Sequence, residues 1–177
     1  MDEIFNLSLS FENTTGVLCD QFALSGKQKK YGQMSKTTIA LAADHAGYEL
    51  KDLLKKDVEA LGFDVLDLGT NGPDRVDYPD FGSALAKAII NGDAQTGILV
   101  CGSGIGISIA ANRHAGIRAA LCHDETLARL SREHNDANVL VLGARTTGIE
   151  VAKACLKTFL NTEFAGGRHQ GRIEKLG

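Results

Sequence analysis

The chain has 177 residues, of which 44% are hydrophobic and 23% charged, a composition typical of a soluble globular domain. The formal net charge of −3 predicts no nucleic-acid partner and no anionic membrane surface, so an anionic ligand must be held by a few placed cations. The sequence contains no apolar run of about 18 residues, as a membrane span requires, and its acidic start lacks the basic residues of a secretory signal, so we expect a cytoplasmic protein.

Residues 1–34 differ from the rest of the chain because they show no sustained hydrophobic period and end in the polar stretch "SGKQKKYGQ" before Met34. Met34 opens "MSKTTIALAADHAG", which resembles a natural start. We interpret residues 1–34 as an extension outside the fold, either a mis-assigned start or an arm that orders on contact. Residues 35–177 are predicted to form a single domain.

From residue 37 onward, short apolar runs alternate with amphipathic segments. The predicted strands are 38–43, 64–69, 97–101, 117–122 and 138–143, and the predicted helices are 47–61, 79–91, 105–114, 124–133 and 147–160. Five such alternations predict an α/β fold, doubly wound, in which a five-stranded parallel sheet carries helices on both faces.

Ligands of such sheets bind beyond the carboxyl ends of the strands, so the residues that follow the strands are candidate site residues. They are Asp44 and His45 after the first strand, Cys101 after the third, His123 and Asp124 after the fourth, and Arg145 after the fifth. Cys122, His123 and Asp124 could ligate a metal ion, but no second Cys or His cluster completes a tetrahedral set, so we expect no metal site.

A glycine turn follows Cys101, with Gly102, Gly104 and Gly106 at alternate positions. Ile107 occupies the position where a dinucleotide fingerprint requires glycine, and the G-K-[ST] of a P-loop is absent. No arginine follows within residues 102–107, which disfavours a phosphatase-like loop. A cradle of backbone N–H groups at the start of a helix remains, suited to an anion.

The four cysteines, at positions 19, 101, 122 and 155, form no C-x-x-C pair, so we expect free thiols. Cys101 stands before a predicted helix, where the helix dipole lowers the pKa of a thiol. It is a candidate proton-abstracting base, and Ser103 could relay a proton or contact an oxyanion. A buried core cysteine is the competing interpretation.

Five motifs resemble the ribose-5-phosphate isomerase B family of sugar-phosphate isomerases, whose relatives include allose-6-phosphate and galactose-6-phosphate isomerases. They are "AADHAGYELK" (42–51), "DYPDFG" (77–82), "CGSGIGISIAANRHAGIRAA" (101–120), "SREHNDANVLVLGAR" (131–145) and "GGRHQGR" (166–172). The resemblance covers about residues 37–176. It implies sheet order 2-1-3-4-5, a homodimer or homotetramer, a sugar-phosphate substrate and no cofactor.

The resemblance also implies the chemistry of three residues. Cys101 is the base that moves a proton between C1 and C2 of the open-chain sugar. Ser103 stabilises the enediolate together with the backbone amides of the glycine turn. His134 opens the furanose ring.

Ten substrate-binding residues are implied in the same way: Asp44, His45, Tyr78, Gly102, Gly104, Gly106, Asn135, Arg145, Arg168 and Arg172. Asp44 binds sugar hydroxyls, Tyr78 borders the ring and Asn135 helps to hold the oxyanion. The resemblance assigns phosphate binding to His45 and the arginines. The spacing of Arg168 and Arg172 agrees, because residues four apart share one face of a helix.

Alternatives to a five-carbon substrate remain open at this level. The sequence does not separate ribose 5-phosphate from allose 6-phosphate or another six-carbon sugar phosphate. Cys101, His134 and Asn135 could also form the nucleophilic set of a cysteine hydrolase. A nucleotide-binding module on a flavodoxin-like sheet is a third possibility.

The position of His134 predicts a shared active site. Cys101 ends the third strand, at the carboxyl edge of the sheet, whereas His134 lies after the fourth helix and before the fifth strand, near the amino edge. A five-residue strand separates those edges by roughly 17 Å. Both residues can act on one sugar if a two-fold axis brings the amino edge of one chain to the carboxyl edge of its partner.

Overall fold

The computed structural model describes residues 37–176, so the predicted extension 1–34 lies outside the described residues. Five parallel strands form one sheet in the order β2-β1-β3-β5-β4. They are β1 (Thr38–Ala43), β2 (Asp64–Asp67), β3 (Thr96–Cys101), β4 (Ala119–Leu121) and β5 (Val139–Gly143). The predicted fold class is confirmed.

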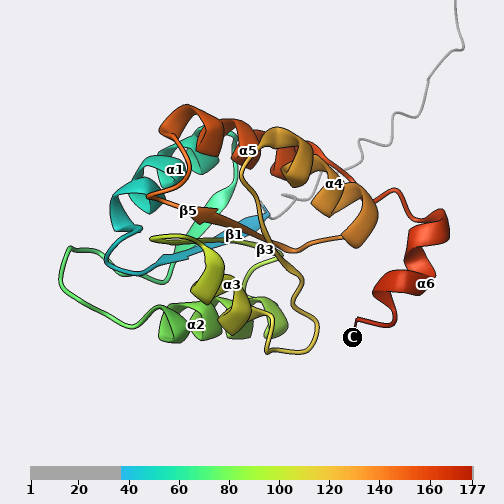
Figure 1. The fold of residues 1–177 in the computed structure, drawn as a ribbon, viewed down its shortest axis with the longest axis horizontal. Helices are drawn as coiled ribbons and strands as arrows, with labels where there is room; N and C mark the ends of the chain where they lie inside the picture. The colour runs from blue at the N-terminus through green and yellow to red at the C-terminus, as the bar shows by residue number, and fades with distance from the viewer. Residues whose placement is uncertain (1–36, 177) are drawn as a thin grey trace, which may run out of the picture. The chain divides into compact units, whose positions relative to one another are not determined.

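Helices cover both faces of this sheet. The covering helices are α1 (Tyr48–Ala60), α2 (Tyr78–Ile90), α3 (Ile105–Ala111), α4 (Glu125–Asn135) and α5 (Ile149–Asn161), and the 3-10 helix η1 (Gly167–His169) and α6 (Gln170–Ile173) follow them. Figure 1 shows α1, α4 and α5 on one face, α2 and α3 on the other, and α6 outside both layers. No helix within residues 37–176 has the length and apolar character needed to cross a membrane.

Strand β1 shows how the sequence builds two cores at once. Ile39 and Leu41 pack into the core beneath α1, α4 and α5, whereas Ala40 and Ala42 face the core beneath α2 and α3. All four are fully buried, because alternate side chains of a strand point to opposite faces. A buried central strand therefore appears in the sequence as an unbroken apolar run.

The strand order corrects the prediction of 2-1-3-4-5, because β5 lies between β3 and β4 and places β4 at the edge. Every residue of β5 is buried, as a strand with neighbours on both sides requires. Strand β4 has only three residues, all partly exposed, which suits an edge. The carboxyl ends of β1, β3 and β5 therefore lie side by side.

Candidate active site

A cavity of about 710 Å³ opens at the carboxyl ends of β1, β3 and β5. Eight of the predicted site residues line it: Asp44, His45, Tyr78, Cys101, Gly102, Ser103, Gly106 and Arg145. The observed strand order explains this grouping, because Arg145 follows β5 and β5 is the direct neighbour of β3. We call this site the carboxyl-edge cavity.

Cys101 lies at the base of the cavity with 4% of its surface exposed. The backbone N–H of Gly104 donates to its Sγ at 3.1 Å, and an amide hydrogen bond stabilises negative charge on sulfur. Gly104 has φ +78°, and a side chain there would collide with Leu121. The amide of Gly104 therefore binds the thiol, and Gly104, unlike Gly102 and Gly106, does not line the cavity.

The other cysteines of the described chain belong to the core. Cys122 and Cys155 are free and buried beneath α4 and α5. Burial raises the pKa of Cys122 to about 12 and that of Cys155 to about 11. These thiols stay protonated at neutral pH, so Cys101 is the only described thiol that reaches the cavity.

Strand β4 carries no part of the cavity wall. Asp124 caps α4 instead, accepting the backbone N–H of Leu127 at 2.9 Å. Among residues 37–176, no group of three His, Cys, Asp or Glu side chains is arranged to hold a metal ion.

Asp44 forms one wall of the cavity and is 6% exposed. Its Oδ1 accepts the backbone N–H groups of Ala46 at 2.9 Å and Gly47 at 3.1 Å. This turn fixes the carboxylate without a side-chain partner. Gly47 permits it, because a Cβ there would lie 2.6 Å from the backbone oxygen of Val100.

His45 and Tyr78 are both placed by the carboxyl-terminal end of one loop, residues 68–77. The Nδ1 atom of His45 lies 3.2 Å from the backbone oxygen of Val76 and 3.3 Å from its nitrogen. Tyr78 begins α2, and its ring lies against the backbone at Gly106, where a Cβ would be 2.6 Å from the ring. Both side chains depend on how this loop is fixed.

A buried lysine, which the sequence analysis did not select, fixes the start of that loop. Lys51 is fully buried, and its Nζ donates to Asp67 Oδ1 at 2.6 Å and to Asn71 Oδ1 at 3.1 Å. Burial alone would raise the pKa of Asp67, but hydrogen bonds from Lys51, Gly69 and Lys55 outweigh it and hold that pKa below its ordinary value. The sequence does indicate that Lys51 is buried, because it stands three residues before Leu54 and seven before Val58, on the buried face of α1.

Arg145 supplies a cation to the cavity. Its backbone N–H donates to the oxygen of Gly102 at 2.9 Å, and its guanidinium carbon lies 3.5 Å from the place of a Cβ on Gly102. Within residues 37–176 the guanidinium pairs with no carboxylate. Arg145 is therefore available to an anion.

The remaining predicted residues, His134, Asn135, Arg168 and Arg172, do not line this cavity. His134 and Asn135 end α4, before β5 begins, whereas Arg145 follows the last residue of β5. Asn135 lines a separate cavity of about 350 Å³. These four residues and His169 form what we call the amino-edge group.

Within the amino-edge group, His169 contacts His134 and Arg168. Its ring stacks on that of His134 with centroids 4.3 Å apart and planes 10° from parallel. Arg168 Nε donates to His169 Nε2 at 3.3 Å. Exclusion from water, followed by the positive charges of His134, Arg168 and Arg172, lowers the pKa of His169, which favours a neutral ring.

The chain is similar to known sugar-phosphate isomerases. The family model for ribose/galactose isomerases matches residues 39–176. Ribose-5-phosphate isomerase B of Escherichia coli is 46% identical over 138 residues, which cover 78% of this chain and 93% of that protein. D-erythrulose-4-phosphate isomerase of Pectobacterium atrosepticum is 42% identical over 142 residues, covering 79% and 93%. The structure of ribose-5-phosphate isomerase B from Clostridium thermocellum superposes with a TM-score of 0.79 at 48% identity, covering 80% of this chain and 95% of that one.

Proposed function

Because this chain belongs to the ribose/galactose isomerase family, we propose that it interconverts ribose 5-phosphate and ribulose 5-phosphate without a cofactor. The observation that carries the proposal is the carboxyl-edge cavity, where a thiol, a glycine turn and the guanidinium of Arg145 converge. The reaction is redox-neutral overall, since one proton leaves C2 and one reaches C1.

We assign the proton transfer to Cys101. The thiolate removes the proton on C2 of the open-chain aldose, and the electron pair moves through C1 to the carbonyl oxygen, giving an enediolate. The amides of Gly102 and Gly106 and the Ser103 hydroxyl stabilise that charge. Proton return to C1 and transfer of the O2 proton to O1 complete the ketose.

We assign phosphate binding to one histidine and three arginines. His45 and Arg145 lie in the cavity, and Arg168 and Arg172 belong to the amino-edge group. Binding the remote phosphate orients the reacting carbons at Cys101. Asp44 holds sugar hydroxyls, and Tyr78 borders the sugar.

The active site is proposed to be shared between two copies of the chain in a homodimer or homotetramer. His134 opens the sugar ring and Asn135 assists, both reaching the cavity from the partner copy. The length of β5, roughly 17 Å, separates them from Cys101 within one chain. Tyr78, Ile105 and Ile109 line the cavity yet are 41%, 55% and 52% exposed, an apolar rim suited to cover by a second copy.

Other substrates and reactions are less well supported. Within one chain the His134 ring stacks on His169, away from Cys101, which disfavours a cysteine hydrolase. A four-carbon substrate is the second candidate, because one relative is an erythrulose 4-phosphate isomerase. A six-carbon sugar phosphate remains the other alternative. For any of these substrates we propose that the protein acts in the cytoplasm.

The test is turnover in deuterated water. The purified full chain is given ribose 5-phosphate, allose 6-phosphate and erythrulose 4-phosphate in parallel. We expect the fastest turnover with ribose 5-phosphate. The product should carry deuterium on the carbon that receives the proton. Absence of turnover with all three sugar phosphates would overturn the proposed function, and a faster rate with another would reassign the substrate.

A further inference from the structure

The last turn of α4 ends in an unusual residue. Asp136, which follows Asn135, has φ +44° and ψ +44°, and among residues 37–176 it is the only non-glycine residue with positive φ. Glycine is the usual choice at this position of a helix end, because it adopts the left-handed conformation without steric cost. The aspartate side chain must therefore contribute something that a glycine would not.

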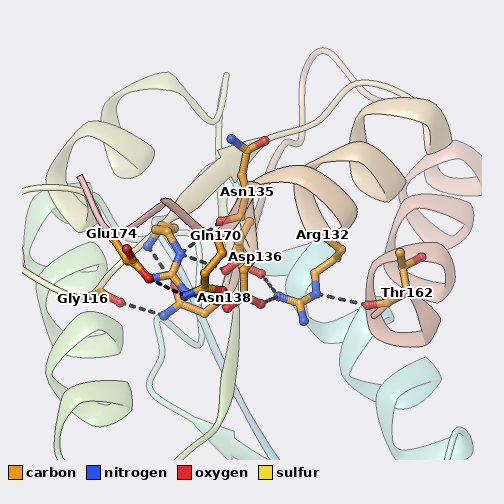
Figure 2. Close-up of polar contacts among 10 residues, drawn as sticks. Gly116, Arg132, Asn135, Asp136, Asn138, Thr162, Gln170 and Glu174 are labelled. Atoms are coloured by element: carbon orange, nitrogen blue, oxygen red, sulfur yellow. Dashed lines mark hydrogen bonds and ion pairs between the residues drawn. The ribbon is translucent and has the colours of Figure 1, made fainter. Parts of the chain in front are cut away.

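The Asp136 carboxylate is held by an arginine on each oxygen. Arg132 Nη1 donates to Oδ1 at 2.9 Å, and Arg118 Nη2 donates to Oδ2 at 3.0 Å. The two arginines are 21% exposed and the aspartate 32%. Figure 2 shows Asp136 at the centre of these contacts, with Arg132 reaching from it toward Thr162. We call Arg118, Arg132 and Asp136 the Asp136 clamp.

Both arginines are anchored to other parts of the fold. Arg132 Nε donates to the backbone oxygen of Thr162 at 3.2 Å, and its guanidinium lies 5.5 Å from the centre of the Phe159 ring, so it binds the end of α5. The backbone N–H of Arg118 donates to Asn138 Oδ1 at 2.8 Å, just before β5. The carboxylate therefore ties the end of α4 to two neighbouring elements.

The clamp also reaches the backbone of the amino-edge group. Arg118 Nε donates to the backbone oxygens of Asn135 at 3.1 Å and Asp136 at 3.0 Å, which satisfies carbonyls that a helix end leaves unpaired. His134 is the preceding residue, and its ring meets His169. The direction of His134 thus depends on a helix end that the clamp holds in place.

We propose that Asp136 is a positioning residue for His134, acting through the two arginines to hold the histidine in the orientation that ring opening requires. This inference rests on the proposed function for its catalytic readout. A role in helix termination alone would be met equally well by glycine, and that difference makes the two interpretations separable.

The decisive variant is Asp136→Gly, because glycine keeps the left-handed helix end and removes only the carboxylate. We expect the melting temperature to stay close to that of the wild type, while kcat with ribose 5-phosphate falls on the order of tenfold or more, as misplacement of a catalytic group does. Asp136→Asn keeps the side-chain shape, and its kcat should lie between those of the wild type and Asp136→Gly. Glu133→Gln is the matched control: its acid pairs with Arg129 at 2.6 Å on the same helix, and kcat should not change.

A double-mutant cycle shows whether Asp136 acts through His134. In a His134→Ala background, adding Asp136→Gly should lower the remaining rate by less than about twofold, since the residue it positions is gone. The proposal is overturned if Asp136→Gly keeps the wild-type kcat, or if its full effect recurs without His134. A wild-type chain that isomerises nothing would refute the proposed function instead. The clamp is then tested by the ring-proton NMR shifts of His134 and His169, which Asp136→Gly should change and Glu133→Gln should not.

Discussion

The carboxyl-edge cavity and the amino-edge group are built in different ways. The cavity is made by backbone geometry: strand ends, a left-handed Gly104 and a thiol that accepts an amide hydrogen bond, all excluded from water. The amino-edge group is made by side chains at a helix end and in a short tail, and Arg168 and Arg172 are exposed. One region holds the thiol that we propose as the base, and the other holds the histidine and arginines that we propose for ring opening and phosphate binding.

That difference has a consequence for the proposed mechanism. Removal of a proton from carbon is faster in a site that excludes water and holds hydrogen-bond donors in fixed positions. The carboxyl edge of the sheet supplies such positions. Ring opening and phosphate binding need groups that approach from the far side of the sugar. A single chain presents the two sets at opposite ends of β5, so we infer that two copies combine them.

The largest effect is expected in the cavity. Cys101→Ala should lower kcat with ribose 5-phosphate by on the order of 10²-fold or more, because it removes the proposed general base. The affinity for inorganic phosphate, measured by calorimetric titration, should be nearly unchanged, because the phosphate cations are intact. Cys155→Ala, which removes a core thiol, is the control and should retain turnover in the fraction that folds. A Cys101→Ala protein with most of the wild-type rate would remove the thiol from the mechanism.

A smaller effect, on KM, is expected in the amino-edge group. Arg172→Ala should raise KM for ribose 5-phosphate by roughly tenfold, because a charge-assisted contact to phosphate is lost. Turnover of unphosphorylated ribose, however slow, should change much less. Arg129→Ala, which removes an exposed arginine of α4, serves as the control. Equal effects of Arg172→Ala on both sugars would exclude this arginine from phosphate binding.

A smaller catalytic effect is expected where the cavity depends on its supporting loop. Lys51→Met removes a fully buried cation that holds loop 68–77, so KM should rise a few-fold and the free energy of unfolding should fall by about 3 kcal/mol. Lys55→Met removes the more exposed partner of Asp67, with an expected loss of about 1 kcal/mol or less. Chemical denaturation and initial rates measure both. Similar losses of unfolding free energy in Lys51→Met and Lys55→Met would contradict the prediction that the buried lysine contributes more than the exposed one.

The pH dependence of Lys51→Met follows from Asp67. The pKa of Asp67 is lowered in the folded protein, so its contribution to stability is complete above the ordinary aspartate pKa and is lost as pH falls through the lowered value. The unfolding free energies of the wild type and Lys51→Met should therefore converge in acid and differ most near neutral pH. If the difference in unfolding free energy between the two proteins stays constant down to strongly acid pH, the stabilising pair of Lys51 and Asp67 is contradicted.

The sequence predicts the two regions unequally well. The residues of the cavity follow β1, β3 and β5, and parallel topology brings such positions together without knowledge of any partner. The amino-edge residues were found through the family resemblance, because the role that we propose for them depends on a surface outside the single chain. The sheet order that we took from the resemblance was wrong at β4 and β5, and the sequence did not correct it because strand–helix alternation does not show which strand lies at the edge.

Lys51 and Asp136 were missed for a related reason. Lys51 pairs with Asp67, and Asp136 pairs with Arg118, so each contact joins residues 16 or 18 positions apart in different elements. Hydrophobic periodicity finds the apolar side of a helix but does not identify the partner of a buried or clamped charge. Such pairs become visible only when the elements are packed together.

Subunit mixing tests most directly whether the two regions meet across copies. Cys101→Ala and His134→Ala proteins, each nearly inactive, are unfolded together and refolded, and mass spectrometry confirms mixed dimers. In a shared site every mixed dimer has one intact and one doubly altered site, so activity should return to roughly a quarter of the wild-type rate. If mixed dimers form and the mixture stays as inactive as its parents, His134 does not act on the cavity of the partner copy.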